Sequence, residues 1–137
     1  MIKKPMKKIL LIEDEEPIRR VLVRILSEEN SNYEIHEEEN GKSGLSKIIN
    51  DDFDLILCDI KMPKMDGIEV LQHARKENVN SPFIMLTGHG NISTAVDAMK
   101  LGAYDFISKP PDLNRLLTAV RNALENKSLV AENKKLK

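Results

Sequence analysis

The stretch LILCDIKMPKMDG, residues 55–67, runs from an apolar segment into a single carboxylate at Asp59. Its first four residues are continuously apolar, which is typical of a β-strand covered on both faces of a sheet. After Asp59, Pro63 and Gly67 turn the chain away from the strand direction. The stretch therefore places a charged side chain at the open end of a buried strand, where a charge needs partners.

The rest of the chain repeats this pattern of a short apolar run followed by a helical segment. The expected strands cover residues 8–13, 33–37, 55–58, 83–86 and 104–108. The expected helices cover residues 17–28, 45–49, 68–74, 92–101 and a final segment from Asp112 onward. Five β–α units in succession predict an α/β fold with a doubly wound, five-stranded parallel sheet and five helices. The expected strand order is the flavodoxin-like 2-1-3-4-5, with an extended last helix.

Length and composition agree with one globular domain. The 137 residues are 41% hydrophobic and 31% charged, which is an ordinary balance for a folded chain. The formal net charge of −1 gives no electrostatic reason to expect nucleic acid or a membrane as the main partner. One cysteine excludes an internal disulfide and fits a reducing cytosol. Because no apolar stretch is long enough to span a bilayer, we expect a cytoplasmic protein.

Polar residues follow the apolar runs at the strand ends, where doubly wound folds bind their ligands. They are Glu13, Asp14, Asp59, Thr87 and Lys109. Three carboxylates at one edge repel each other at neutral pH, and a single ammonium group does not balance them. A divalent cation held by oxygen ligands would complete the balance. The absence of His and Cys from the set favours Mg²⁺ over Zn²⁺, with Mn²⁺ as a substitute.

Asp59 is the candidate nucleophile of this set. A phosphoryl group on its carboxylate would meet the ammonium of Lys109, the hydroxyl of Thr87 and the cation, which are the usual groups for phosphoryl transfer. Aspartate carboxylates can form aspartyl-phosphates. The residues alone therefore predict a metal-assisted phosphoryl acceptor.

Four motifs occur in the order of these strand ends: LLIEDEE, LILCDIKMPKMDG, MLTGHG and GAYDFISKP. Together they resemble the receiver domain of two-component response regulators, over residues 6–126. The segment TGHGNISTAVDAMKLGAYDFISKP is most similar to the nitrogen-regulation class of sigma-54-dependent activators. The resemblance implies a phosphorylation-dependent signalling switch that controls an output such as transcription. It implies no enzyme with a separate substrate, because such a domain catalyses only its own Mg²⁺-dependent phosphotransfer and autodephosphorylation.

The resemblance also implies roles around the metal. Asp59 would accept the phosphoryl group from the phosphohistidine of a sensor histidine kinase. Asp14 would bind Mg²⁺ directly, Glu13 would bind it through water, and Asp59 would be a further ligand. The backbone carbonyl of Lys61 would supply another protein ligand.

Three further residues would act on the phosphoryl group or respond to it. Lys109 would pair with the phosphoryl group, and Thr87 would donate a hydrogen bond to it. Phe106 matches the family's aromatic switch position, which turns inward as the threonine moves. The Lys109–Pro110 peptide bond resembles one that is cis in this family.

Residues 127–137 continue the last helix with helix-forming residues and contain no Pro or Gly. Leu129 and Leu136 lie one heptad apart, which predicts a helical linker or the start of a coiled coil, and a homodimer through the last helices. A frayed, charged helix end is the alternative.

The tail also resembles the linker that leads to an ATPase domain in the same class of activators. No Walker motif or helix-turn-helix is present in the sequence. An effector with ATPase and DNA-binding parts is therefore expected in a longer chain, and a single-domain regulator is the alternative. The segment itself is not expected to contact nucleic acid.

Two other functions use a similar architecture. A haloacid-dehalogenase-like phosphohydrolase also has an Asp nucleophile and Mg²⁺, but it needs a second Asp two residues later, where this chain has Lys61. A flavodoxin-like cofactor binder needs a phosphate loop rich in Ser, Thr and Gly after the first strand. This chain has EDEEP there, which would repel phosphate.

Overall fold

Five parallel strands form one sheet at the centre of the molecule. The computed structural model describes residues 6–88 and 92–135, and for residues 126–135 it describes the backbone alone. The sheet order is β2-β1-β3-β4-β5, which confirms the predicted doubly wound topology. The strands are β1 (Lys7–Ile12), β2 (Tyr33–Glu38), β3 (Leu55–Asp59), β4 (Phe83–Thr87) and β5 (Asp105–Ser108).

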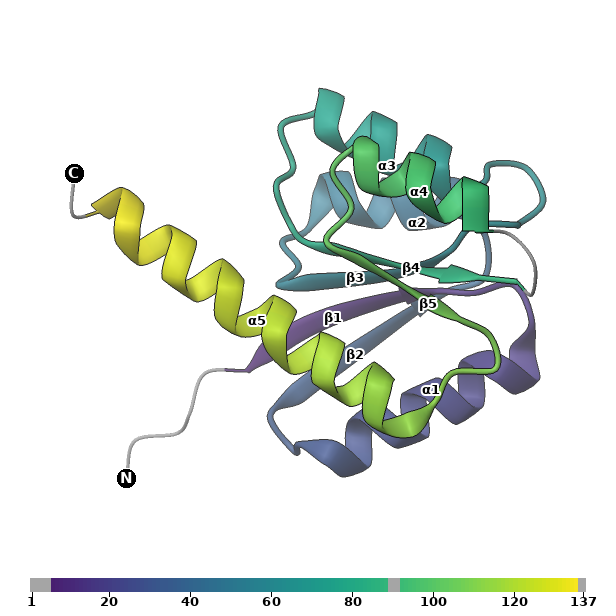
Figure 1. Ribbon diagram of the computed structural model, residues 1–137, viewed down its shortest axis with the longest axis horizontal. Helices are drawn as coiled ribbons and strands as arrows, with labels where there is room; N and C mark the ends of the chain where they lie inside the picture. Colours follow the sequence, from purple (N-terminus) through teal and green to yellow (C-terminus); the bar gives the residue numbers. More distant parts are fainter. Residues whose placement is uncertain (1–5, 89–91, 136–137) are drawn as a thin grey trace.

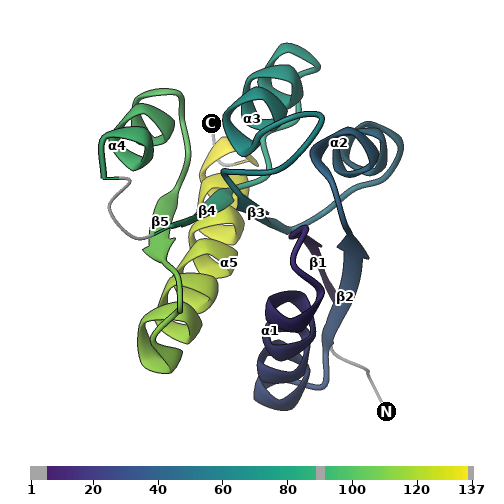
Figure 2. The same ribbon diagram turned by 90° about the vertical axis from the view of Figure 1, so that its right-hand side faces the viewer.

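Helices cover both faces of this sheet (Figure 1). They are α1 (Glu16–Glu29), α2 (Gly41–Asn50), α3 (Gly67–Lys76), α4 (Ile92–Lys100) and α5 (Leu113–Lys135). Figure 2 shows α2, α3 and α4 on one face and α1 and α5 on the other. The last helix is extended, as predicted, and its C-terminal part projects beyond the sheet in Figure 1. Among the described residues, no helix has both the length and the apolar composition needed to cross a membrane.

The core is divided by the sheet into two layers because successive strand residues point to opposite faces. In β1, Ile9 and Leu11 pack toward α1 and α5, whereas Leu10 and Ile12 pack toward the layer of α2, α3 and α4. All four side chains are fully buried. This two-sided burial explains why the central strands are continuous apolar runs.

The register of the strands brings their carboxyl ends to one edge. Ile12 pairs with Cys58, Asp59 pairs with Leu86, and Thr87 pairs with Ser108. β1 ends one residue earlier than predicted because its ladder with β3 stops at Ile12. Glu13 therefore belongs to the loop that follows the strand, where its side chain is free to turn toward Asp59.

A tight turn carries the chain from Asp59 into α3. The N–H of Gly67 donates to the carbonyl of Ile60 at 2.8 Å. A Cβ atom at Gly67 would lie 2.4 Å from the carbonyl oxygen of Asp59, so only glycine fits this approach. Asp66 caps α3 in a reciprocal capping box with Glu69.

Candidate functional site

Three carboxylates meet at the carboxyl edge of the sheet. One oxygen from each of Glu13, Asp14 and Asp59 lies within 4.8 Å of the other two. Glu13 and Asp14 follow β1, and Asp59 is the last residue of the neighbouring strand β3. Glu13 is 0% exposed and Asp59 is 2% exposed, so these two charges are withdrawn from solvent. The strand-end pattern in the sequence correctly indicated that the three groups would lie together.

Lys109 supplies the positive charge in this cluster. Its Nζ donates to Oε1 of Glu13 and to Oδ2 of Asp59, each at 3.1 Å. The lysine reaches the site because its backbone N–H donates to the carbonyl of Thr87 at 2.7 Å, which ties the segment after β5 to the end of β4. The Lys109–Pro110 peptide bond is cis, as the sequence resemblance implied.

The cluster opposes ionisation of Asp59. Burial, the negative charge of Glu13 and a hydrogen bond with Glu13 raise the pKa of Asp59 to about 7, although Lys109 acts in the opposite direction. Burial acts to lower the pKa of Lys109, but Asp59 and Glu13 together raise it above its usual value. The ammonium group therefore stays charged, and one lysine does not fully offset the carboxylates.

The carboxylate oxygens of the cluster suit a small, hard cation that prefers oxygen ligands. Oδ1 of Asp14 is buried and has no hydrogen-bond partner in the described part of the chain. Such an oxygen normally has a partner, and a metal ion would supply one. Three carboxylates and one ammonium group leave an excess of negative charge. The atoms able to bind a metal ion in this cluster are carboxylate oxygens, which suits Mg²⁺. Lys61, two residues after Asp59, is exposed, and the ligand role of its carbonyl stays a prediction.

Thr87 and Phe106 lie on the neighbouring strands. Thr87 is buried, and its hydroxyl donates to the carbonyl of Ile107 at 3.5 Å. Phe106 is half-buried and packs against the core layer beneath α4. Its strand partner is Met85, next to Leu86 and Thr87 in β4. The two residues therefore lie on adjacent strands, two register positions apart, and their roles in switching stay predictions.

Arg19 also contacts this site, although no motif in the sequence indicates it. Its Nη1 donates to the carbonyl oxygen of Glu13 at 2.8 Å, and its Nε donates to Oε1 of Glu37 at 3.2 Å. In the sequence, the one indication of this contact is that Arg19 lies in the first turn of α1, four residues after Glu15 and close to the acidic loop. The N–H of Glu15 also supports the site, by donating to Oε2 of Glu13 at 3.2 Å.

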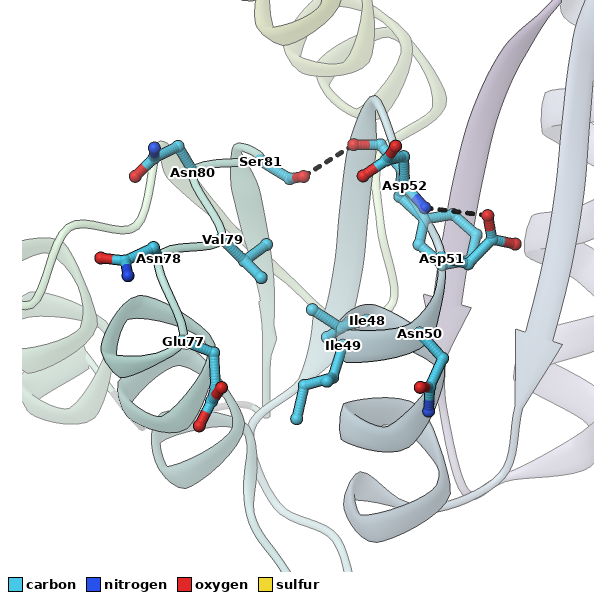
Figure 3. Close-up of a pocket in the computed structure, with 11 residues that line it drawn as sticks. Ile48, Ile49, Asn50, Asp51, Asp52, Glu77, Asn78, Val79, Asn80 and Ser81 are labelled. Atoms are coloured by element: carbon cyan, nitrogen blue, oxygen red, sulfur yellow. Dashed lines mark hydrogen bonds between the residues drawn. The ribbon is translucent and has the colours of Figure 1, made fainter.

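Hollows are also present on the surface of the described residues. One of about 700 Å³ is at the opposite edge of the sheet, between the ends of α2 and α3 (Figure 3), and contains none of the predicted site residues. The hydroxyl of Ser81, which is labelled in Figure 3, donates to the carbonyl of Phe53 at 2.7 Å. A second hollow, of about 550 Å³, adjoins the site itself. Its lining is mostly apolar and includes Ile18 and Val21 of α1 and the segment 109–111.

Comparison with known proteins agrees with this geometry. Residues 9–121 match the family model of the response regulator receiver domain. The chain is 35% identical over 125 residues to the regulatory protein AtoC of Escherichia coli, covering 91% of this chain and 27% of AtoC. It is 37% identical over 131 residues to the nitrogen assimilation regulatory protein NtrX of Azorhizobium caulinodans, covering 94% and 28%. The chain thus spans little more than a quarter of these two relatives.

Solved structures give the same result. A response regulator receiver domain protein from Clostridium thermocellum superimposes with a TM-score of 0.84 at 31% identity, covering 91% of this chain and 99% of that one. NtrX from Brucella abortus superimposes with a TM-score of 0.88 at 36% identity, covering 96% and 30%. These likenesses agree with the nitrogen-regulation class indicated by the sequence, and they set aside the phosphohydrolase and the flavodoxin-like cofactor binder. The chain belongs to the response regulator receiver domains of two-component systems.

Proposed function

We propose that Asp59 is the phosphoacceptor of this receiver domain. The observation that carries the proposal is the shared contact of the Lys109 ammonium with Asp59 and Glu13, at 3.1 Å each, beside the unpartnered oxygen of Asp14. The donor of the phosphoryl group is the phosphohistidine of a sensor histidine kinase. Mg²⁺, or Mn²⁺ in its place, would be held by Asp14 and Asp59 directly, by the carbonyl of Lys61, and by Glu13 through water.

The chemistry is an in-line displacement at phosphorus. A carboxylate oxygen of Asp59 forms a bond to phosphorus, the P–N bond to the histidine breaks, and its electron pair stays on the imidazole. Lys109 offsets the negative charge on the phosphoryl oxygens, and Thr87 donates a hydrogen bond to one of them. The bound cation would supply further charge neutralisation and would favour the ionised form of Asp59, whose pKa is raised without it.

Phosphorylation would then change the conformation around Thr87 and Phe106. In this structure the Thr87 hydroxyl faces the carbonyl of Ile107. Turning it toward the phosphoryl group would break that weak contact, and the half-buried ring of Phe106 would move inward. The switch thus shifts an existing equilibrium between two packings of β4, β5 and α4.

We further propose that the receiver domain covers residues 6–126 and that residues 127–137 form a linker toward an effector. The support is the family match over residues 9–121 and the greater length of the relatives. The effector would contain ATPase and DNA-binding parts and act on transcription in the cytoplasm. The domain itself would catalyse only its own phosphotransfer and dephosphorylation. The apolar hollow beside Lys109 is suited to contact a protein partner such as the kinase.

Incubation with acetyl phosphate and Mg²⁺, followed by intact mass measurement, tests this function. The wild type is expected to gain one phosphoryl group and the Asp59→Asn variant none. Asp52→Asn is the matched control, because Asp52 is an exposed acid at the opposite edge of the sheet. If the wild type gains no phosphoryl group, even with a phosphorylated kinase, the assignment of Asp59 is wrong.

A further inference from the structure

Arg19 holds the loop that carries the acidic pair. Its guanidinium contacts two acceptors at once, the backbone carbonyl of Glu13 and the carboxylate of Glu37 at the end of β2. The side chain is 15% exposed, so most of the arginine lies within the protein. The backbone of Glu13 is held from the other side by its own N–H, which donates to the carbonyl of Glu38 at 3.1 Å.

These contacts bear directly on the metal ligands. The carbonyl of Glu13 belongs to the peptide group that joins Glu13 to Asp14, so a contact that holds it restrains the backbone from which both side chains project. The Glu13 carboxylate has donors on both oxygens, but Oδ1 of Asp14 has no partner among the described residues. Arg19 therefore holds the peptide group from which Asp14, with its unpartnered Oδ1 atom, projects.

We propose that Arg19 is a positioning residue for the divalent cation: it preorganises the Glu13–Asp14 peptide through the Glu13 carbonyl. The inference rests on the proposed Mg²⁺ site and adds a residue outside the ligand set. Arginine suits this role because its planar fork reaches the carbonyl through Nη1 and Glu37 through Nε at the same time. A lysine would reach only one of them.

The direction in which Mg²⁺ affinity changes when Arg19 is replaced distinguishes a positioning role from a purely electrostatic one. A positive group near the site repels a cation, so by charge alone the loss of Arg19 would tighten Mg²⁺ binding. Loss of a positioning contact would weaken it, because the ligands would no longer be held in place before the metal arrives. Substitution of a residue that orients metal ligands from outside the ligand set typically lowers the affinity for the metal 10- to 100-fold.

Calorimetric titration of Mg²⁺ into Arg19→Gln and Arg20→Gln decides between the two. Both variants remove one positive charge from α1, but the Arg20 side chain is 76% exposed and pairs with Glu16, one turn earlier in the same helix, at 2.6 Å. Arg19→Gln is expected to weaken Mg²⁺ binding about tenfold, and Arg20→Gln to leave it within about twofold of wild type. Equal or tighter binding by Arg19→Gln overturns the proposal, as does an equal loss in both variants.

Arg19→Lys and urea unfolding in EDTA separate positioning from general destabilisation. Arg19→Lys keeps the charge and is expected to weaken Mg²⁺ binding about threefold. Its free energy of unfolding should stay close to that of the wild type. In the acetyl phosphate reaction, Arg19→Gln should need more Mg²⁺ for half-maximal rate and recover the wild-type rate at saturation. A lower maximal rate with an unchanged Mg²⁺ midpoint contradicts the proposal.

Failure of this inference is distinguishable from failure of the proposed function. If the wild type binds Mg²⁺ but gains no phosphoryl group, the function is wrong and the binding comparison still decides the role of Arg19. If the wild type is phosphorylated and Arg19→Gln binds Mg²⁺ normally, only the role of Arg19 is wrong. If the wild type does not bind Mg²⁺, the inference is wrong as well.

Discussion

Asp59 is held where its own charge is unfavourable, and this follows from the residues around it. It ends a strand in which every residue is buried, and it shares Lys109 with a second buried carboxylate. Burial and Glu13 raise the pKa of Asp59 to about 7. A nucleophilic carboxylate must be ionised, so the site is complete only when further positive charge is bound.

This raised pKa predicts that the stability of the metal-free protein depends on pH. Between about 3.8 and 7 the folded state keeps a proton on Asp59 that the unfolded chain releases, so stability falls as the pH rises and levels off above 7. The contribution of Asp59 to the free energy of unfolding should drop by about 1.4 kcal/mol between pH 6 and pH 8. Urea unfolding in EDTA at several pH values measures this drop.

Two comparisons isolate Asp59 from other titrating groups. Asp59→Asn should remove this part of the pH dependence and be more stable than the wild type at pH 8 without metal, whereas Asp52→Asn should follow the wild type. Saturating Mg²⁺ should also flatten the wild-type profile, because the cation favours the ionised carboxylate. A wild-type profile that matches Asp59→Asn without metal would contradict the raised pKa.

At the level of single residues, sequence reasoning predicted the acidic cluster because strand ends in a parallel sheet share one edge. Glu13, Asp14, Asp59 and Lys109 were found by this rule, and the structure brings them together. The contact from Arg19 was not predictable in the same way. It depends on a side-chain direction on α1 and on a backbone carbonyl, and neither leaves a pattern of residue types in the sequence.

Among the elements, the turn from β3 into α3 has the strictest steric requirement. A Cβ at Gly67 would lie 2.4 Å from the Asp59 carbonyl oxygen and 2.9 Å from the Cα of Ile60. Both contacts are with backbone, which cannot move aside without displacing the strand end. Gly102 at the end of α4 differs, because its φ of +103° is the constraint and the nearest neighbour of an added Cβ would be 3.7 Å away.

Gly67→Ala and Gly102→Ala should therefore destabilise the protein for different reasons and by different amounts. Gly67→Ala is expected to cost about 3 kcal/mol, as overpacking against backbone does, and to weaken Mg²⁺ binding by displacing Asp59. Gly102→Ala is expected to cost ~1 kcal/mol through backbone strain alone and to leave Mg²⁺ binding unchanged. Urea unfolding and calorimetric titration measure the two effects. Equal Mg²⁺ affinity in both variants would show that the turn does not position Asp59.

The elements themselves were predictable because their signals are local. Continuous apolar runs indicated the central strands, and Asp112 indicated the start of the last helix, where its side chain accepts the backbone N–H of Arg115. The boundaries were less accurate. β5 begins at Asp105 rather than at residue 104, because its ladder with β4 begins at Ile84 and Asp105. Such limits depend on pairing between segments far apart in the chain, which a local pattern does not contain.

At the scale of the whole molecule, α5 begins against the sheet and extends beyond it (Figure 1). Its first part is buried against the sheet through Leu116 and Val120, whereas its backbone continues as helix to Lys135. The predicted heptad pair lies beyond this anchored part: the side chain of Leu129 and all of Leu136 fall outside the described residues. The seam therefore stays a prediction from the sequence.

We predict that the end of α5 mediates dimerisation. A helix that projects beyond its own domain has no core to cover an apolar stripe, so a second copy of the same helix is the expected partner. Sedimentation velocity should show a concentration-dependent dimer for residues 1–137 and a monomer for residues 1–126. The shorter chain should retain Mg²⁺ binding and phosphorylation, because the residues of the site lie between Glu13 and Lys109. If both chains sediment alike, the tail is a solvated helix end, and any dimer must form through another surface of the domain.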